Sequence, residues 1–320
     1  MALDAIPFQS SLHFRGCGFQ VPQQKVTNAA LFAQNPKLNQ EVVRSRLGLE
    51  ERYHLADQES MIDVACMAAE RALDDAGMPA SVVELVIVAT WTPYQKVPSN
   101  ACHIASKLGL PVMAFDVSAA CSGFVYAAHI AEQFLNQGQY KVALIIGMDA
   151  LSPYIDFQRK DCVFFGDGAG AAIVTAREDG QKNSLTRVYS GGQTDAFYLD
   201  QQAPYFHMDA KAIFNQATTF LPIALAELFA EAKITLDDVD LVIPHQPSRH
   251  LLTSVFEAAG YSTEKVYINV QRYGNTSAAT IPIALSELKQ EGKLSPGDLL
   301  LFVSIGAGMT WTVGLHSWAE

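Results

Sequence analysis

Cys121 is the residue whose type and setting best suit chemistry. It lies in the run FDVSAACSGF (115–124), where an apolar segment gives way to small residues. Residues 114–117 are predicted to form a strand and 122–136 a helix, so Cys121 would open that helix. Because free N–H groups and the helix dipole favour negative charge there, we expect a lowered pKa and a reactive thiolate. A lone cysteine is more often structural, which is our interpretation of the other four: Cys17, Cys66, Cys102 and Cys162.

Two further residues could act on a carbonyl together with Cys121. His245 follows the apolar run LVIP (241–244), and Asn275 lies in YGNTSAA (273–279), a glycine-containing turn ahead of a predicted helix. Each alone is more often structural, but together they supply a nucleophile, a proton donor and an amide donor for thioester chemistry. The same three residue types occur in papain-like proteases, although the sequence typical of a protease cysteine is absent here.

The elements that must position these residues fall into two similar halves. Segments 76–88 and 232–244 share a helix end, a short connector and the start of a strand, and each half carries Gly-Ala-Gly, at 168–170 and 306–308. Strands and helices alternate, which predicts sheets covered by helices. We expect an α/β protein in which residues 1–174 carry the cysteine and 175–320 carry the histidine and asparagine. FGDGAG (165–170) lacks the ending of a phosphate-binding loop and is predicted to be a structural turn near the site.

Composition argues against several classes of protein. The 320 residues carry a formal net charge of −11 and no basic block longer than two residues, so we expect neither nucleic-acid nor membrane binding. The N-terminus shows no signal peptide, and the apolar runs are too short to span a bilayer. The five cysteines include no CxxC pair. We therefore expect reduced thiols in the cytoplasm and no metal site.

Seven motifs carry a resemblance over essentially the whole chain. They are RSRLGLEERY (44–53), VPSNACHIASKLG (97–109), FDVSAACSGFVYA (115–127), CVFFGDGAGAAIV (162–174), IPHQP (243–247), YGNTSAATIPIAL (273–285) and FVSIGAGMTWTVGL (302–315). In this order they resemble the β-ketoacyl-acyl-carrier-protein synthase III family, condensing enzymes of the thiolase superfamily. The resemblance implies a duplicated five-layer αβαβα thiolase-like fold, a homodimer and the catalytic set Cys121, His245 and Asn275.

The resemblance also implies a mechanism with two half-reactions. Cys121 would attack an acyl-CoA, form an acyl-enzyme and release CoA. A malonyl thioester, on CoA or on a carrier protein, would then lose carbon dioxide while His245 and Asn275 donate hydrogen bonds to its carbonyl. The resulting carbanion would attack the acyl-cysteine. Backbone N–H groups of Cys121 and Ala307 would hold the acyl oxyanion, and no cofactor is expected.

Several positions depart from the family pattern where substrate binds. The arginines that help to grip CoA match Arg46 and Arg159, but the tryptophan position is Val42. In the family, a tunnel takes the acyl chain, and the tunnel positions that usually hold bulky aromatic residues match Val97 and Ile305. We therefore predict more room for the acyl chain and a preference for acyl-CoAs of medium length.

The helix after the catalytic histidine, where the family docks its acidic carrier protein, has fewer basic residues here. It has Arg249 and His250 but then Glu257, so dependence on a carrier protein is open. An alternative function is a same-fold acyltransferase that passes the acyl group to an amine or alcohol, and Asn275 argues against it. The intact set of three residues argues against a third reading, a catalytically silent partner subunit.

Overall fold

The computed structural model describes residues 11–176 and 185–319, and within them one large sheet carries the fold. Its strands are Leu12–Gln20 (β1), Leu85–Ala89 (β4), Met113–Val117 (β5), Val142–Asp149 (β6), Gly168–Ala176 (β7), Leu185–Ser190 (β8), Leu241–Pro244 (β11), Leu299–Gly306 (β12) and Thr310–Trp318 (β13). They run in the order β11-β12-β13-β1-β7-β6-β4-β5, and β8 pairs with β13. The main helices are Met61–Asp75 (α2), Asn100–Lys107 (α3), Gly123–Asn136 (α4), Ala210–Ala232 (α5), Arg249–Ala258 (α6) and Thr280–Gln290 (α8).

The strand pairings repeat in the two halves. β4 pairs with β6 in parallel, as β11 pairs with β12. β6 and β7 are antiparallel, as are β12 and β13, and β7–β1 matches β13–β8. These shared pairings agree with the internal similarity that the sequence indicates. The predicted division after residue 174 falls inside β7, and that division stays a prediction.

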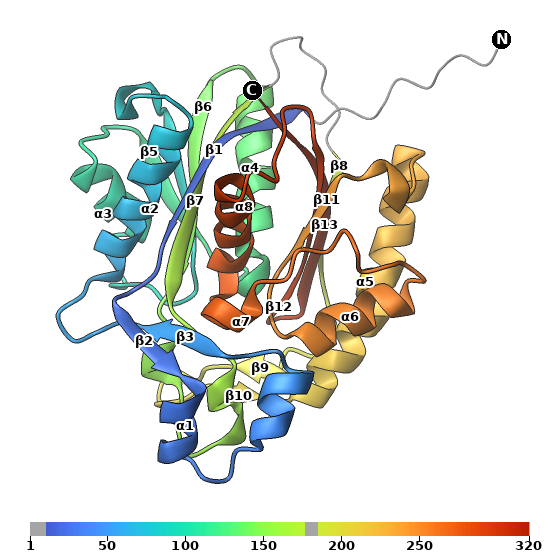
Figure 1. The fold of residues 1–320 in the computed structure, drawn as a ribbon. Helices are drawn as coiled ribbons and strands as arrows, with labels where there is room; N and C mark the ends of the chain where they lie inside the picture. The colour runs from blue at the N-terminus through green and yellow to red at the C-terminus, as the bar shows by residue number, and fades with distance from the viewer. Residues whose placement is uncertain (1–10, 177–184, 320) are drawn as a thin grey trace.

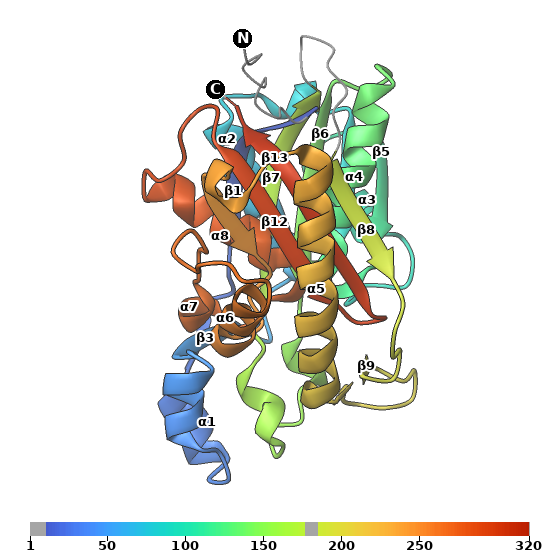
Figure 2. The ribbon, with the colours of Figure 1, turned by 90° about the vertical axis from the view of Figure 1, so that its right-hand side faces the viewer.

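The layers follow from which face of the sheet each helix covers (Figure 1). Helices α2 and α3 lie outside the first half of the sheet, α4 and α8 lie between the halves, and α5 and α6 lie outside the second half. Figure 2 shows α5 crossing the outer face of β8, β12 and β13. By length and composition α5 alone could cross a membrane, among the helices described, but such a helix also occurs in protein cores. The three pairs of helices and the two halves of the sheet between them make five layers, which confirm the predicted αβαβα architecture.

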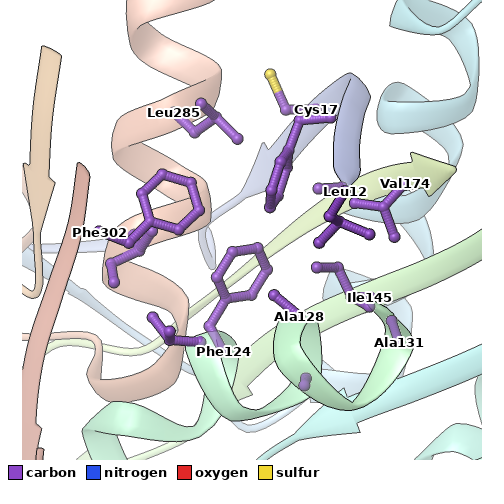
Figure 3. Packing of buried hydrophobic residues seen from close by; sticks show 14 of the residues in the cluster. Leu12, Cys17, Phe124, Ala128, Ala131, Ile145, Val174, Leu285 and Phe302 are labelled. Carbon is purple, nitrogen blue, oxygen red and sulfur yellow. The ribbon is translucent and has the colours of Figure 1, made fainter. Parts of the chain in front are cut away.

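The central layer is held by apolar side chains that meet between the two halves (Figure 3). Phe124 of α4 and Phe302 of β12 are fully buried, with their ring centroids 6.4 Å apart. Phe14 of β1 packs edge-on against Phe302 at 5.2 Å. Burial of such rings contributes roughly 1.5–3 kcal/mol each. α4, which follows the cysteine, and β12, which leads into Gly-Ala-Gly, are thereby fixed to one another.

A smaller set of elements covers one end of the layers and encloses the site. It comprises Gln24–Thr27 (β2), Asn28–Gln34 (α1), Glu51–His54 (β3), Phe197–Tyr198 (β9), His207–Met208 (β10) and Val270–Tyr273 (α7). In Figure 1 most of these elements lie below the sheet, around the 150–165 segment. They share an apolar cluster that includes Leu151, Phe165 and Phe206.

Candidate active site

Cys121 lies where the sequence predicts, between a strand and a helix. β5 ends at Val117, the 3₁₀ turn Ala120–Ser122 follows, and α4 begins at Gly123. Ala120 has a φ of 46°, a backbone conformation that non-glycine residues rarely adopt and that is found most often at functional sites. The cysteine is half-buried and lines a cavity of about 440 Å³. The turn therefore presents the sulfur to an enclosed space.

The prediction of a lowered pKa for Cys121 is wrong. Burial raises the pKa of the thiol to about 12, and the nearby Asp149 carboxylate raises it further. Hydrogen bonds from Ser277, Asn275 and the Cys121 backbone act in the opposite direction. Loss of hydration outweighs them because a thiolate in a largely apolar cavity is poorly solvated. At neutral pH Cys121 is therefore a neutral thiol.

His245 is placed directly after β11 and is buried in the same cavity. Its Nδ1 atom lies 2.8 Å from the Thr280 hydroxyl oxygen. Burial lowers the pKa of His245 to about 3, so the imidazole is neutral. A neutral imidazole donates from one nitrogen only. It can therefore donate a hydrogen bond to a substrate carbonyl from Nε2 when Nδ1 accepts from Thr280.

Asn275 is oriented by its own loop. Its Oδ1 accepts the Ser277 backbone N–H at 2.8 Å, which directs Nδ2 to act as the donor toward Cys121. Its backbone N–H donates to the Phe164 carbonyl at 2.7 Å, and its carbonyl accepts from Gly166 at 3.1 Å. The FGDGAG segment thus holds the asparagine loop in place. Residues 165–167 form the predicted connection near the site, whereas residues 168–170 are already the first residues of the strand β7.

Asp149, at the end of β6, anchors the loop that carries Asn275. This buried carboxylate accepts hydrogen bonds from the Thr90 and Thr92 hydroxyls at 2.9 and 2.8 Å. Gly147 allows the close approach of this loop, because a Cβ there would lie 2.1 Å from the Ala278 carbonyl oxygen. Asp149 was not among the site residues predicted from the sequence, although a single carboxylate at the end of an apolar run (VALIIGMD) is a usable signal.

The glycine-rich turn after β12 closes the other side of Cys121. Gly306 packs so near that an added Cβ would lie 2.8 Å from the Cys121 backbone nitrogen. Ala307 lines the cavity together with Cys121. The backbone N–H groups expected to form the oxyanion hole therefore belong to two segments that meet at the sulfur. Their role in holding the oxyanion stays a prediction.

The predicted substrate-binding residues divide into two groups. Arg46 and Ile305 line the cavity, and Arg46 donates to His250 Nε2 at 2.8 Å. Arg159 is absent from the cavity lining; it donates to the Phe206 carbonyl at 2.8 Å and pairs with Asp161. Val97 is 81% exposed and also lies outside that lining.

The sequence analysis missed Trp91 as a cavity residue. Its indole packs edge-on against Phe197 with centroids 5.8 Å apart and donates to the Ser277 hydroxyl oxygen at 3.2 Å. Val42, at the family's tryptophan position, lines the same cavity. No group of three or more potential metal ligands occurs in the described part of the chain.

Comparisons with known proteins agree with this arrangement. The family model 3-oxoacyl-[acyl-carrier-protein (ACP)] synthase III matches residues 115–191, and the model of its C-terminal part matches 215–318. The chain is 39% identical over 298 residues to the β-ketoacyl-[acyl-carrier-protein] synthase III of Aquifex aeolicus (strain VF5), covering 92% of this chain and 96% of that protein. It is 38% identical over 311 residues to the synthase III of Paramagnetospirillum magneticum, covering 92% and 95%.

The solved structures extend the likeness to three dimensions. The crystal structure of 3-oxoacyl-[acyl-carrier-protein] synthase III from Aquifex aeolicus VF5 has a TM-score of 0.90 and 37% identity, covering 96% of this chain and 100% of that one. The chain therefore belongs to the β-ketoacyl-acyl-carrier-protein synthase III family, as its motifs predicted. It is a condensing enzyme with a thiolase-like fold.

Proposed function

We propose that this chain joins an acyl-CoA to a malonyl thioester by decarboxylative condensation, through an acyl group on Cys121. The observation that carries the proposal is that Cys121, His245 and Asn275, from three distant segments, line one cavity of about 440 Å³. The names of the relatives support the same reaction class. Such a product suits fatty acid biosynthesis.

In the first half-reaction, the Cys121 sulfur attacks the acyl carbon of the acyl-CoA. The carbon–sulfur bond to CoA breaks, and the proton of the thiol ends on the CoA sulfur. Backbone N–H groups of Cys121 and Ala307 would stabilise the oxyanion during this exchange, a contribution that typically reaches 10²–10³ in rate. Because the resting thiol has a raised pKa, attack is favoured only once these donors are engaged.

In the second half-reaction, His245 Nε2 and Asn275 Nδ2 donate hydrogen bonds to the malonyl thioester carbonyl. The carbon–carbon bond to the carboxylate breaks, carbon dioxide leaves, and the electron pair forms an enolate. The enolate carbon then attacks the acyl-cysteine, and the Cys121 sulfur leaves. The neutral state of His245 suits this role, because a neutral donor adds no charge that would have to be buried before substrate enters.

The mouth of the cavity offers limited positive charge to a carrier protein. Arg46 and Lys211 line the cavity, and Arg249 begins α6, while Glu257 lies near the end of that helix. The names of the relatives support a carrier protein as the source of the malonyl group, and the few basic residues here lead us to propose a weaker dependence on carrier charge than the basic family helix implies. Parallel assays with malonyl-CoA and a malonyl-carrier protein separate the two sources of the malonyl group.

A second copy of the chain is the partner that the surface supports. β5 is an edge strand of the large sheet, and Met113 on it is exposed. Tyr94 and Val97, in the segment before α3, are 54% and 81% exposed. An unpaired edge with apolar side chains nearby suits pairing with an identical edge. We expect a homodimer in sedimentation analysis and a cytoplasmic enzyme with free cysteines.

The test of the function is a product assay. The protein is incubated with an acyl-CoA and a malonyl thioester, and released carbon dioxide and the β-ketoacyl thioester are measured by mass spectrometry. Equal amounts of both products are expected. Acyl transfer to an added amine or alcohol, without carbon dioxide, would instead support the acyltransferase alternative, for which the relatives' names give no support. No acyl adduct and no product would fit the silent subunit.

A further inference from the structure

Glu287, a carboxylate of α8, accepts three hydrogen bonds in the interior of the protein, and neither half-reaction uses it. Its Oε2 accepts from the Asn269 side-chain amide at 2.6 Å and from the Arg272 guanidinium at 2.8 Å. Its Oε1 accepts from the Tyr273 hydroxyl at 2.8 Å. Glu287 is 7% exposed, and a buried charge is tolerated where it is paired and hydrogen-bonded in this way. The three donors therefore hold the carboxylate in one place.

The Gln246 side chain connects Asn269 to the backbone around His245. Its Oε1 accepts the Asn269 backbone N–H at 3.0 Å, and its Nε2 donates to the carbonyls of Pro244 and Tyr267 at 3.0 and 2.9 Å. Gln246 is 1% exposed and directly follows His245. The backbone on both sides of His245 is thereby tied to Asn269 and so to the carboxylate. We call Gln246 and Asn269 the histidine arm.

Tyr273 connects the same carboxylate to Asn275. It ends α7, and only Gly274 separates it from Asn275. Gly274 has a φ of 64°, a value that favours glycine, so the chain turns sharply at this point. The Tyr273 ring packs edge-on against Phe19, with centroids 5.6 Å apart. The hydroxyl bond to Glu287 therefore fixes the start of the loop that presents Asn275. We call Tyr273 the asparagine arm.

We propose that Glu287 is a positioning residue that sets the spacing between His245 and Asn275 by holding the histidine arm and the asparagine arm on one carboxylate. The inference rests on the proposed function, in which these two side chains donate to the same malonyl carbonyl. Two donors stabilise one oxygen only when both point at it, and small displacements are costly in rate. Glu287 thus acts on the reaction through the two arms and touches no substrate itself.

The proposal predicts an effect on the second half-reaction alone. Acylation relies on the backbone N–H groups of Cys121 and Ala307, which belong to the turn before α4 and the turn after β12. Those two elements are packed together by Phe124 and Phe302, with centroids 6.4 Å apart. Displaced His245 and Asn275 donors should therefore slow decarboxylation and leave acylation intact. A merely structural role would lower both half-reactions together.

The first test measures both half-reactions in single-turnover assays of Glu287→Met. Methionine has a similar length but offers the arms no carboxylate oxygen. Carbon dioxide release and condensation should fall about tenfold, less than for deletion of a donor, because the donors are displaced rather than removed. The acylation rate and the KM for acyl-CoA should not change. Tyr273→Phe removes only the hydroxyl of the asparagine arm, so condensation should fall about fivefold, again with normal acylation.

Glu291→Met is the matched control. Glu291 follows the last residue of α8, accepts from the Tyr267 hydroxyl at 3.0 Å and pairs with Lys293 at 2.7 Å. It belongs to neither arm, so the same substitution there should leave both half-reactions unchanged.

The second test measures amide hydrogen exchange by mass spectrometry, without any substrate. Exchange reports how readily each segment opens. In Glu287→Met, exchange should quicken together in residues 245–248 and 269–277, the two loops that the arms hold, and should stay at the wild-type rate in β12. Glu291→Met should match the wild type in both loops.

Each test has outcomes that would overturn the proposal. In the first, these are unchanged condensation, or equal losses in both half-reactions, in Glu287→Met and Tyr273→Phe. In the second, they are faster exchange in neither loop, in one loop only, or throughout β12 as well. Failure of the wild-type protein to condense would count against the proposed function, whereas the exchange rates would still decide whether Glu287 joins the two loops.

Discussion

The Nδ1 atom of His245 lies 2.8 Å from the hydroxyl oxygen of Thr280, the first residue of α8. The same hydroxyl is also placed to donate to the Ser277 carbonyl oxygen at 2.9 Å, and its one hydrogen serves only one of these two acceptors at a time. When the hydroxyl donates to Nδ1, the imidazole carries its hydrogen on Nε2, the nitrogen that would donate to the malonyl carbonyl. The acceptor that the Thr280 hydroxyl takes therefore decides which nitrogen of His245 carries the hydrogen.

Replacement of Thr280 tests this relationship. Thr280→Val removes the hydroxyl with little change of shape, so condensation should fall by about 10²-fold, the typical effect of losing one oxyanion donor. Acylation of Cys121 should persist, and Thr280→Ser should restore condensation. Single-turnover assays of the two half-reactions measure the split. An equal loss in both half-reactions would assign Thr280 a general structural role instead.

Replacement of the nucleophile is the most direct test of the site. Cys121→Ser should abolish the acyl adduct, because a serine hydroxyl without a nearby base is a far weaker nucleophile than a thiolate. Cys162→Ser, which changes a fully buried cysteine outside the cavity lining, should leave acylation nearly intact. Intact-mass measurement after incubation with acyl-CoA reports the adduct. Label on another cysteine of the wild-type protein would refute the assignment.

Asn275→Ala should separate the two half-reactions. The variant loses the Nδ2 donor to the enolate, so decarboxylative condensation should fall by about 10²-fold or more. Transfer of the acyl group from CoA should continue, and His245→Ala should behave similarly. Carbon dioxide release and acyl-adduct formation are measured side by side. A comparable loss of acylation in Asn275→Ala would favour the acyltransferase alternative.

Because His316 is buried, we expect the free energy of unfolding to fall at acid pH, which gives the pH–stability profile an acid limb. Burial lowers its pKa from 6.5 to about 4, so the unfolded chain takes up the proton first as pH falls. Its contribution is complete above about pH 6.5 and is lost toward pH 4, by at most roughly 3 kcal/mol. The His316 ring packs edge-on against Phe14 and at a tilt against Phe302, with centroid distances of 5.4 and 4.8 Å. His316→Phe should therefore flatten the limb.

Urea unfolding at several pH values measures this effect. The comparison is the pH dependence of unfolding free energy in wild type and His316→Phe, rather than either value alone. His245 contributes in the same direction, since its pKa is lowered to about 3, so part of the acid limb should remain in the variant. An identical limb in both proteins would show that His316 is accessible to protons in the folded state.

The length of the preferred acyl chain tests the prediction that Ile305 leaves more room for that chain than a bulky aromatic residue would. An apolar pocket gains roughly 0.8 kcal/mol for each methylene it buries, so a few carbons shift preference by more than tenfold. We expect octanoyl-CoA to have a higher kcat/KM than acetyl-CoA, and Ile305→Phe to move the preference toward short chains. Trp91 occupies part of the same cavity, so Trp91→Ala should extend the preference further. A clear preference of the wild type for acetyl-CoA would refute the prediction.

The family and the order of the elements could be predicted from the sequence alone, and so could the three residues that meet in the cavity, whose catalytic roles stay predictions. Local patterns suffice for this: small residues around Cys121 allow a tight turn between strand and helix, and the apolar run ending at Pro244 places His245 at a strand end. The repeated strand pairings could also be anticipated, because each half carries the same alternation of strand and helix.

The electrostatics of the site, and the contacts that support its residues, could be learned only from the folded structure. The thiol pKa was predicted to be low from the helix end, yet burial raises it, because solvation depends on every segment around the sulfur. Asp149 and Ala278 come from segments far apart in the chain and meet only because Gly147 admits the loop. Arg159 likewise contacts Phe206 and Asp161, which the sequence did not indicate, and its role in binding CoA stays a prediction. Such contacts depend on long-range packing, which local sequence patterns do not specify.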